Sequence, residues 1–190
     1  KFLISSAKSK GTELSPENAR AMIQLCGNEM LILSSEIDKV SSYVGTGEIT
    51  MEDIEKVVVA KVEERVFDLS KAILSVNAQR AMEIVSGLIY QRESPIGIIS
   101  ILIMSYADMY RAFVSKKAGK NVNEAAAVFD YKGREFRLRN AFGIKISRNA
   151  LEKSLDILYN CEKQMKSTAL DQELLLEKAV MELISVRELE

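Results

Sequence analysis

The chain has 190 residues, of which 47% are hydrophobic and 28% charged, and its formal net charge is −1. This composition can build a packed core and excludes an intrinsically disordered chain. Histidine is absent, which excludes serine–histidine and cysteine–histidine catalysis and histidine-ligated metal sites. The length fits one large domain or two small ones.

Cysteine usage and hydropathy bear on the cellular compartment. Cys26 and Cys161 form no CxxC pair, and we expect buried, reduced thiols. The longest apolar stretch, residues 96–107, falls short of the roughly 18 residues that span a membrane. The chain begins without Met, in a pattern typical of the last turns of a helix, so we expect a fragment of a longer protein. The sequence therefore predicts a cytoplasmic protein with no membrane segment.

Helical periodicity organises the first third of the chain. Residues 15–17 combine an N-cap serine, a proline and an acid, which is typical of a helix start, and Gly27 ends that helix. The next helix ends at residues 45–47 and carries an apolar stripe of Met30, Leu33, Ile37, Val40 and Val44. Thr50 caps a short third helix. Residues 1–63 are thus predicted to form a small helical unit.

Residues 61–65 are charged and lie between two apolar patterns. They are the best candidate for an interdomain hinge, with a helix extension as the alternative. In the second domain, residues 64–190, Asn77 and the pair at residues 94–95 are predicted to start helices, the latter running to Lys117. That long helix is apolar except for a narrow stripe of Ser100, Asp108, Arg111 and Ser115. We expect it to be the centre of the second core.

The remaining helices should pack around this central one. They are predicted over residues 124–129, over residues 133–142, after the N-cap Ser147, and from about Leu170 to the end. The last helix has apolar residues over a wide arc, more than one neighbouring helix would cover. This arc is interpreted either as closure of the core or as a face for a partner subunit.

Residues that could carry chemistry are few. Glu36 and Asp38 stand two apart on a helix, which directs them to different faces and predicts solvated surface charges. Residues 45–47 are Gly-Thr-Gly but lack the GxxxxGK[ST] pattern of a phosphate-binding loop, so a turn is expected. No catalytic, cofactor-binding or metal-binding residue is predicted, and no cofactor is expected.

Positive charge gathers in one segment. Residues 111–148 contain ten Lys or Arg against three acids, whereas the rest of the chain contains sixteen against twenty-four. Such a segment can meet phosphates or an acidic partner surface; the alternative is a solvated basic face whose aromatic residues are core. No base-reading motif accompanies the charge. The candidate contact residues are Lys132, Arg134, Arg137, Arg139, Lys145 and Arg148.

Several segments, in order along the chain, resemble the delta subunit family of the bacterial DNA polymerase III clamp loader. Residues 35–43, SEIDKVSSY, are similar to the family's "NEIxKLxxY", and residues 49–54, ITMEDI, to its "ITxEDV". Residues 66–73 resemble the opening of the family's collar domain, and residues 93–95 its "ge-x-P" step. Residues 166–171, KSTALD, stand where the family has "K-x-G-x-D", with Ala169 in place of Gly.

The resemblance implies an all-α architecture: a three-helix lid of a degenerate AAA+ module over residues 1–63, followed by a helical collar over residues 64–190. It implies a non-catalytic assembly part of a subunit of the DNA-directed DNA polymerase III holoenzyme, which helps load the sliding clamp onto primed DNA. Its partners would be gamma/tau and delta-prime type subunits, bound through the collar. The clamp itself would be reached only through an amino-terminal domain that this sequence lacks.

Two alternative functions stay open at this point. The chain is also compatible with the lid and collar end of an active clamp-loader or related AAA+ ATPase, whose phosphate loop would lie upstream. It is likewise compatible with a helical adaptor that binds DNA directly through residues 111–148.

Overall fold

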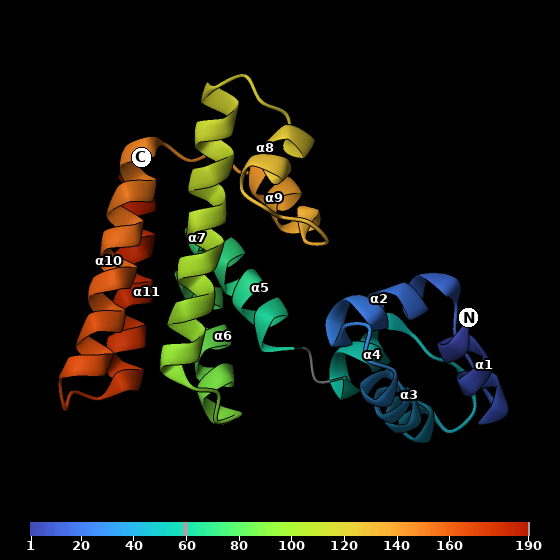
Figure 1. The fold of residues 1–190 in the computed structure, drawn as a ribbon. Coiled ribbons are helices and arrows are strands. Elements are labelled where there is room, and N and C mark those ends of the chain that lie inside the picture. The colour runs from blue at the N-terminus through green and yellow to red at the C-terminus, as the bar shows by residue number, and fades with distance from the viewer. Residues whose placement is uncertain (59–60, 190) are drawn as a thin grey trace. The chain divides into compact units, whose positions relative to one another are not determined.

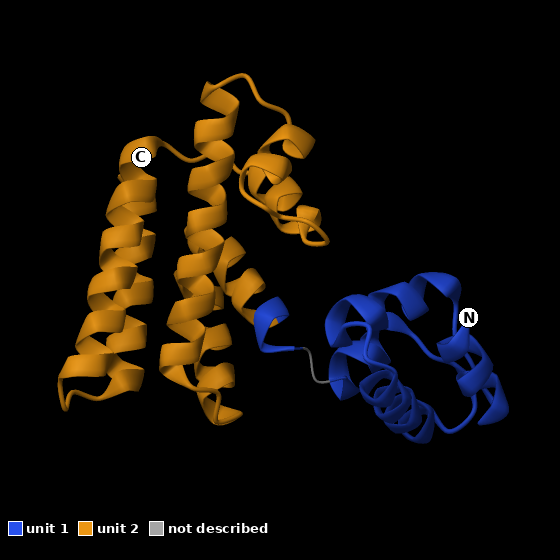
Figure 2. Ribbon diagram, in the orientation of Figure 1, with its two compact units in different colours: residues 1–64 blue, residues 65–190 orange. Residues whose placement is uncertain are grey.

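The computed structural model describes residues 1–58 and 61–189. Over these residues the chain forms eleven α-helices and one pair of two-residue strands. The predicted all-α class is thereby confirmed. The chain divides into two compact units, residues 1–64 and residues 65–190 (Figure 2).

Unit 1, residues 1–64, consists mainly of helices (Figure 1). They are α1 (Phe2–Ser9), α2 (Pro16–Cys26), α3 (Met30–Val44) and α4 (Met51–Val57), with strands β1 (Thr12–Glu13) and β2 (Gly47–Glu48). The strands pair in parallel, with Thr12 opposite Gly47, and the Ile49 N–H donates to the Glu13 carbonyl at 2.8 Å. The sequence did not predict this pair, because a strand of two residues is too short to show alternation of apolar and polar residues.

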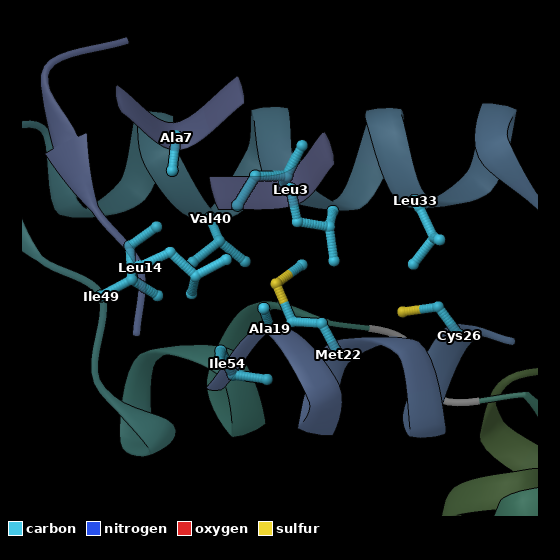
Figure 3. Close-up of a cluster of buried hydrophobic side chains, with 11 residues drawn as sticks. Leu3, Ala7, Leu14, Ala19, Met22, Cys26, Leu33, Val40, Ile49 and Ile54 are labelled. Atoms are coloured by element: carbon cyan, nitrogen blue, oxygen red, sulfur yellow. The ribbon is translucent and has the colours of Figure 1, made fainter. Parts of the chain in front are cut away.

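The core of unit 1 draws on all four helices. Figure 3 shows aliphatic and sulfur-containing side chains converging between them, and its buried members are Leu3, Ala7, Leu14, Ala19, Met22, Cys26, Leu33, Ile37, Val40, Ile49 and Ile54. Leu3 and Ala7 come from α1, so the unit has a fourth core helix where the resemblance implied three. The predicted apolar stripe of α3 supplies Leu33, Ile37 and Val40.

One carboxylate of unit 1 was placed wrongly by the sequence. Glu36, expected on the surface, is only 8% exposed. It follows Leu33 by three residues and so lies at the edge of the buried stripe of α3. Lys39, three residues further on, pairs with its carboxylate at 2.7 Å, which compensates part of the cost of burial.

The predicted helix starts are confirmed. The side chains of Ser15, Asn77, Ser94 and Ser147 each accept a hydrogen bond from the backbone N–H three residues on. Thr50 forms a full capping box with Asp53. These caps satisfy N–H groups that have no partner within the helix, and they fix where each helix begins.

Unit 2, residues 65–190, contains the longer helices (Figure 1). They are α5 (Val62–Leu74, which begins in the last residues of unit 1), α6 (Ala78–Tyr90), α7 (Pro95–Lys117), α8 (Val122–Val128), α9 (Glu135–Phe142), α10 (Arg148–Ser167) and α11 (Gln172–Glu188). Residues 62–65, predicted as a hinge or a helix extension, belong to α5.

Helix α7 is the centre of unit 2 and packs against α8, α9, α10 and α11. Its bounds agree with the prediction, and Ile98, Ile99, Leu102 and Tyr106 are buried. By length and hydropathy alone it could also cross a membrane. The four packed neighbours instead fit the core helix of a globular unit, which passes the same test.

The wide apolar arc of helix α11 is partly buried and partly exposed. Its buried residues are Leu175, Leu176, Ala179, Val180, Leu183 and Ile184, and they close the core against α6, α7 and α10. Leu174 and Met181, seven residues apart and therefore on one side of the helix, remain 65% and 43% exposed. Core closure thus explains most of the arc but not all of it.

Candidate nucleic-acid or partner interface

The basic segment folds around the second half of α7. Helices α8 and α9 pack on each other and on α7, and Asn121 starts α8 with a capping box that includes Glu124. Leu138 and Ala141 are the buried residues of α9. Burial of this small apolar face leaves the charged positions of α9 toward solvent or toward the polar positions of α7.

A buried carboxylate fastens this region to α7. Asp108 is 4% exposed. Its Oδ2 accepts from Arg137 Nε at 2.9 Å and Nη2 at 2.7 Å. Its Oδ1 accepts from Arg111 Nη1 at 3.2 Å and from the Tyr131 hydroxyl. Both Arg137 bonds go to Oδ2, and charge-assisted hydrogen bonds to both carboxylate oxygens compensate the burial of Asp108. The Asp108 network therefore joins α9 and the loop before it to α7.

Tyr131 is the second fixed point of the network. Burial, and next the hydrogen bond to Asp108, raise the pKa of the Tyr131 hydroxyl, which therefore stays protonated and donates at neutral pH. The same oxygen accepts from Arg111 Nη1 at 2.8 Å. The Arg111 guanidinium also lies 5.8 Å from the Tyr131 ring centroid and 6.0 Å from that of Phe129. The network thus holds the aromatic residues between α8 and α9 in place.

The structure separates the six predicted contact residues into two groups. Arg137 is internal, because Asp108 binds it on two atoms, and Arg148 pairs with Glu152 at 2.8 Å. Arg148 is exposed despite this pairing, and so are the other four residues: Lys132, Arg134, Arg139 and Lys145. Lys132 and Lys145 have no salt-bridge partner within the described part of the chain. These four side chains form the exposed basic group.

One acid, Glu135, lies within the exposed basic group, and backbone N–H groups hold its carboxylate. The backbone N–H groups of Glu135 and Gly133 lower the pKa of the Glu135 carboxyl, and the charge of Arg139 adds to this effect. The Gly133 N–H lies 2.9 Å from Glu135 Oε1. Arg134 lies with its guanidinium 5.9 Å from the Tyr131 ring centroid. Because residues 130–145 contain five Lys or Arg against two acids, this face carries net positive charge.

The aromatic residues of the segment differ in exposure. Tyr131 is buried, as the interpretation of the aromatics as core predicts, but Phe136 on α9 is 60% exposed. Phe142, at the end of α9, is partly covered by Lys116, whose Nζ lies 5.5 Å from the ring centroid. An exposed ring among cations can stack on a nucleic-acid base or pack on an apolar side chain of a partner.

Sequence reasoning missed the organising residue. Asp108 was assigned to a polar stripe of α7, whereas it is the buried acceptor for Arg111, Arg137 and Tyr131. The sequence did contain an indication that Asp108 is paired: it is the one acid of an apolar helix and has an arginine three residues further on. The partners from α9 and its loop had no such signal, because they lie more than twenty residues away.

The two cysteine thiols lie in the hydrophobic core. Cys26 and Cys161 are free and buried, as predicted, and burial raises the pKa of each thiol to about 11. Both stay protonated at neutral pH, which disfavours a nucleophilic role. Over residues 1–58 and 61–189, no group of three or more Cys, Asp or Glu is placed to hold a metal ion.

The structure thus defines a mainly helical fold with an exposed basic face in unit 2. The family described as "DNA polymerase III delta subunit, C-terminal domain" matches residues 63–183. The chain therefore belongs to this family, and the resemblance inferred from sequence motifs is confirmed.

Two comparisons extend the similarity to both units. The chain is 23% identical to the DNA polymerase III subunit delta of Bacillus subtilis (strain 168) over 192 residues, which cover 98% of this chain and 54% of that protein. The solved structure of the Bacillus subtilis DNA clamp loader delta protein is similar with a TM-score of 0.76 and 23% identity, over 97% of this chain and 55% of that one. The chain thus spans about half the length of these relatives.

Proposed function

We propose that this chain is the attachment part of a clamp-loader delta subunit, which helps load a sliding clamp onto primed DNA during replication. In this proposal residues 1–63 are the lid of a degenerate AAA+ module and residues 64–190 are the collar. The observation that carries the proposal is the family match over residues 63–183, which covers most of unit 2. The chain would work in the cytoplasm, without cofactor and without catalytic activity of its own.

The proposed partners are gamma/tau and delta-prime type subunits, which the collar would bind. Unit 2 offers apolar side chains for such contacts: Met104 on α7, Tyr159 on α10, and Leu174 and Met181 on α11 are each at least 43% exposed. Exposed apolar groups on helices are common in subunit interfaces. Contact with the sliding clamp would belong to the part of the delta relatives that this chain does not span.

Co-elution tests this proposal directly. The chain, mixed with purified gamma/tau and delta-prime type subunits, should run with them on a sizing column. Met104→Glu or Leu174→Glu should weaken the association, because each puts a charge into an apolar contact. Leu31→Glu is the matched control, since Leu31 is 87% exposed but lies in unit 1. Consistent separate elution of the unaltered chain would refute the collar assignment.

A second function, direct contact with DNA, is favoured by the exposure of Phe136 beside the exposed basic group. A cationic groove with a stacking ring binds single strands with little sequence preference, and its affinity falls as salt rises. We propose that Lys132, Arg134, Arg139 and Lys145 meet phosphates while Phe136 stacks on a base. Arg137 and Arg148 would not take part directly, because Asp108 and Glu152 occupy them.

Fluorescence anisotropy with labelled primed DNA can separate this function from assembly. Lys132→Glu combined with Lys145→Glu should weaken binding and flatten its salt dependence, and Phe136→Ala should weaken it at every salt concentration. Lys153→Glu is the control, because this exposed lysine lies on α10 outside the basic segment. Equal losses in the control and in the test variants would indicate a nonspecific charge effect and reject the site.

A further inference from the structure

The C-terminal ends of α7 and α9 meet within unit 2, where the two helices pack side by side (Figure 1). Arg137, in the first turn of α9, pairs with Asp108 of α7 at 2.7 Å. Phe142, at the end of α9, has its ring centroid 5.5 Å from Lys116 Nζ of α7. Residue numbers rise along both helices from the first contact to the second, so the helices run in the same general direction. Lys116 therefore stands at the end of α9.

Helix geometry separates Lys116 from its neighbour Lys117. Asp108 marks the side of α7 that meets α9, and Lys116 lies about a quarter-turn from that side. Lys117 follows Asp108 by about 2.5 turns and so lies on the opposite side of α7, with its Nζ 5.9 Å from the centroid of the Phe113 ring. Both lysines are exposed and stand in the last turn, where both complement the helix dipole. Only Lys116 contacts α9.

The positive charge at this end of α9 has no acid beside it in the sequence. Residues 109–123 and residues 136–147 contain no Asp or Glu. Within the part of the chain that the structure describes, neither Lys116 nor Lys145 has a salt-bridge partner. Lys145 follows the last residue of α9 by three positions. Lys116 and Lys145 thus bring two uncompensated charges to the same end of the helix.

One stripe of α9 leads from Lys116 to the exposed ring. Phe136, Arg139 and Phe142 follow one another at a spacing of three and are therefore neighbours on the helix surface. Phe136 is 60% exposed, Arg139 is exposed, and Phe142 lies beside Lys116. Aromatic and basic side chains therefore alternate along a continuous line from the first turn of α9 to α7.

The length of α9 sets the size of what this line can bind. Lys132 and Arg134 lie at the start of the helix, and its 8 residues extend about 12 Å at about 1.5 Å per residue. A nucleic-acid strand carries one phosphate about every 3.4 Å of duplex length. About three to four phosphates of one strand therefore match the distance between the two basic ends.

We propose that Lys116 and Lys145 bind phosphates at one end of a short single strand that follows α9. Lys132 and Arg134 bind phosphates at the other end, and Phe136 stacks on a base between them. The inference rests on the second proposed function, direct contact with DNA, and adds to it a contact residue from α7 and the class of nucleic acid. A single strand fits the surface because a ring stacks on a base only where that base is unpaired.

Fluorescence anisotropy with a labelled oligothymidylate and the unaltered chain as reference tests this inference. Lys116→Gln removes one phosphate contact, so it should weaken binding severalfold and reduce the salt slope of log K by about 0.7. Lys117→Gln is the matched control, because it makes the same charge change in the same helical turn but on the side of α7 away from α9. It should bind as the unaltered chain does. Circular dichroism should show equal helix content in both variants.

Weaker binding and a lower salt slope in Lys116→Gln alone support the proposal, and equal behaviour of Lys116→Gln and Lys117→Gln overturns it. If Lys132→Glu with Lys145→Glu weakens binding while Lys116→Gln does not, direct DNA contact stands and this inference alone fails. Absence of binding by the unaltered chain ends both. Tighter binding of a duplex of the same length, or equal competition by polyglutamate and unlabelled oligothymidylate, also overturns it.

Discussion

Unit 1 and the junction of α7, α8 and α9 in unit 2 are held together differently. The core of unit 1 consists of aliphatic and sulfur-containing side chains from four helices. The junction instead depends on one buried carboxylate, Asp108, shared by Arg111, Arg137 and Tyr131. Apolar packing tolerates exchange among side chains of similar size, whereas a buried ionic network fails when one member is removed. The difference predicts how each region responds to substitution.

The largest effect is expected in the core of unit 1. Ile37→Ala removes a fully buried side chain of α3 and should lower the free energy of unfolding of unit 1 by about 3–4 kcal/mol. Hydrogen exchange with mass spectrometry reads the protection of residues 1–58 separately from that of unit 2. Leu31→Ala, on the same helix but 87% exposed, should leave protection nearly unchanged. Equal losses in both variants would show that the core is not dry and packed.

Removal of the shared carboxylate should have the next largest effect. Asp108→Ala leaves Arg111, Arg137 and Tyr131 without their acceptor, and we expect a loss of about 2–3 kcal/mol. This is below the loss for a fully buried pair, because the Arg111 and Arg137 side chains are 42% and 28% exposed and can be rehydrated. Hydrogen exchange should show lost protection across α8 and α9. Asp156→Ala, an exposed carboxylate on α10, is the control.

Two arginines of α9, Arg137 and Arg139, can show whether the Asp108 network or surface charge stabilises this region. Arg137→Ala removes both contacts that Arg137 makes with Asp108 Oδ2 and should destabilise unit 2 by about 1–2 kcal/mol. Arg139→Ala removes an exposed residue of the same helix and should cost less than about 0.5 kcal/mol. Urea unfolding followed by tyrosine fluorescence measures both. The reverse order would show that the basic segment is stabilised by α9 surface charge and not by Asp108.

Alkaline pH should act on both units. Burial raises the pKa of Cys26 in unit 1 and of Cys161 in unit 2 from 9.0 to about 11. A raised folded-state pKa means that each thiol loses its proton first in the unfolded chain. The contribution of these thiols to stability is therefore constant below about pH 9 and falls between pH 9 and about pH 11. Thermal melts across this range measure the decline. Cys26→Ala should reduce it in unit 1 alone, and no reduction would contradict the assignment.

The sequence located helix starts because their signals are local. Ser15, Asn77, Ser94 and Ser147 accept the predicted backbone hydrogen bonds, since a cap depends only on residues within one turn. It also identified α7 as the central helix of unit 2, because an apolar surface on nearly all sides must be covered by neighbours. Glu36 was misplaced because the comparison with Asp38 overlooked its position three residues after Leu33, at the edge of the buried stripe of α3.

Composition, periodicity and ordered motifs therefore determined the helical class and the family by themselves. Both depend on residues that are close together in the sequence. Only the tertiary structure decided which charges of the basic segment are available. Arg137 and Arg139 are alike in sequence, but α9 turns one toward Asp108 and leaves the other exposed.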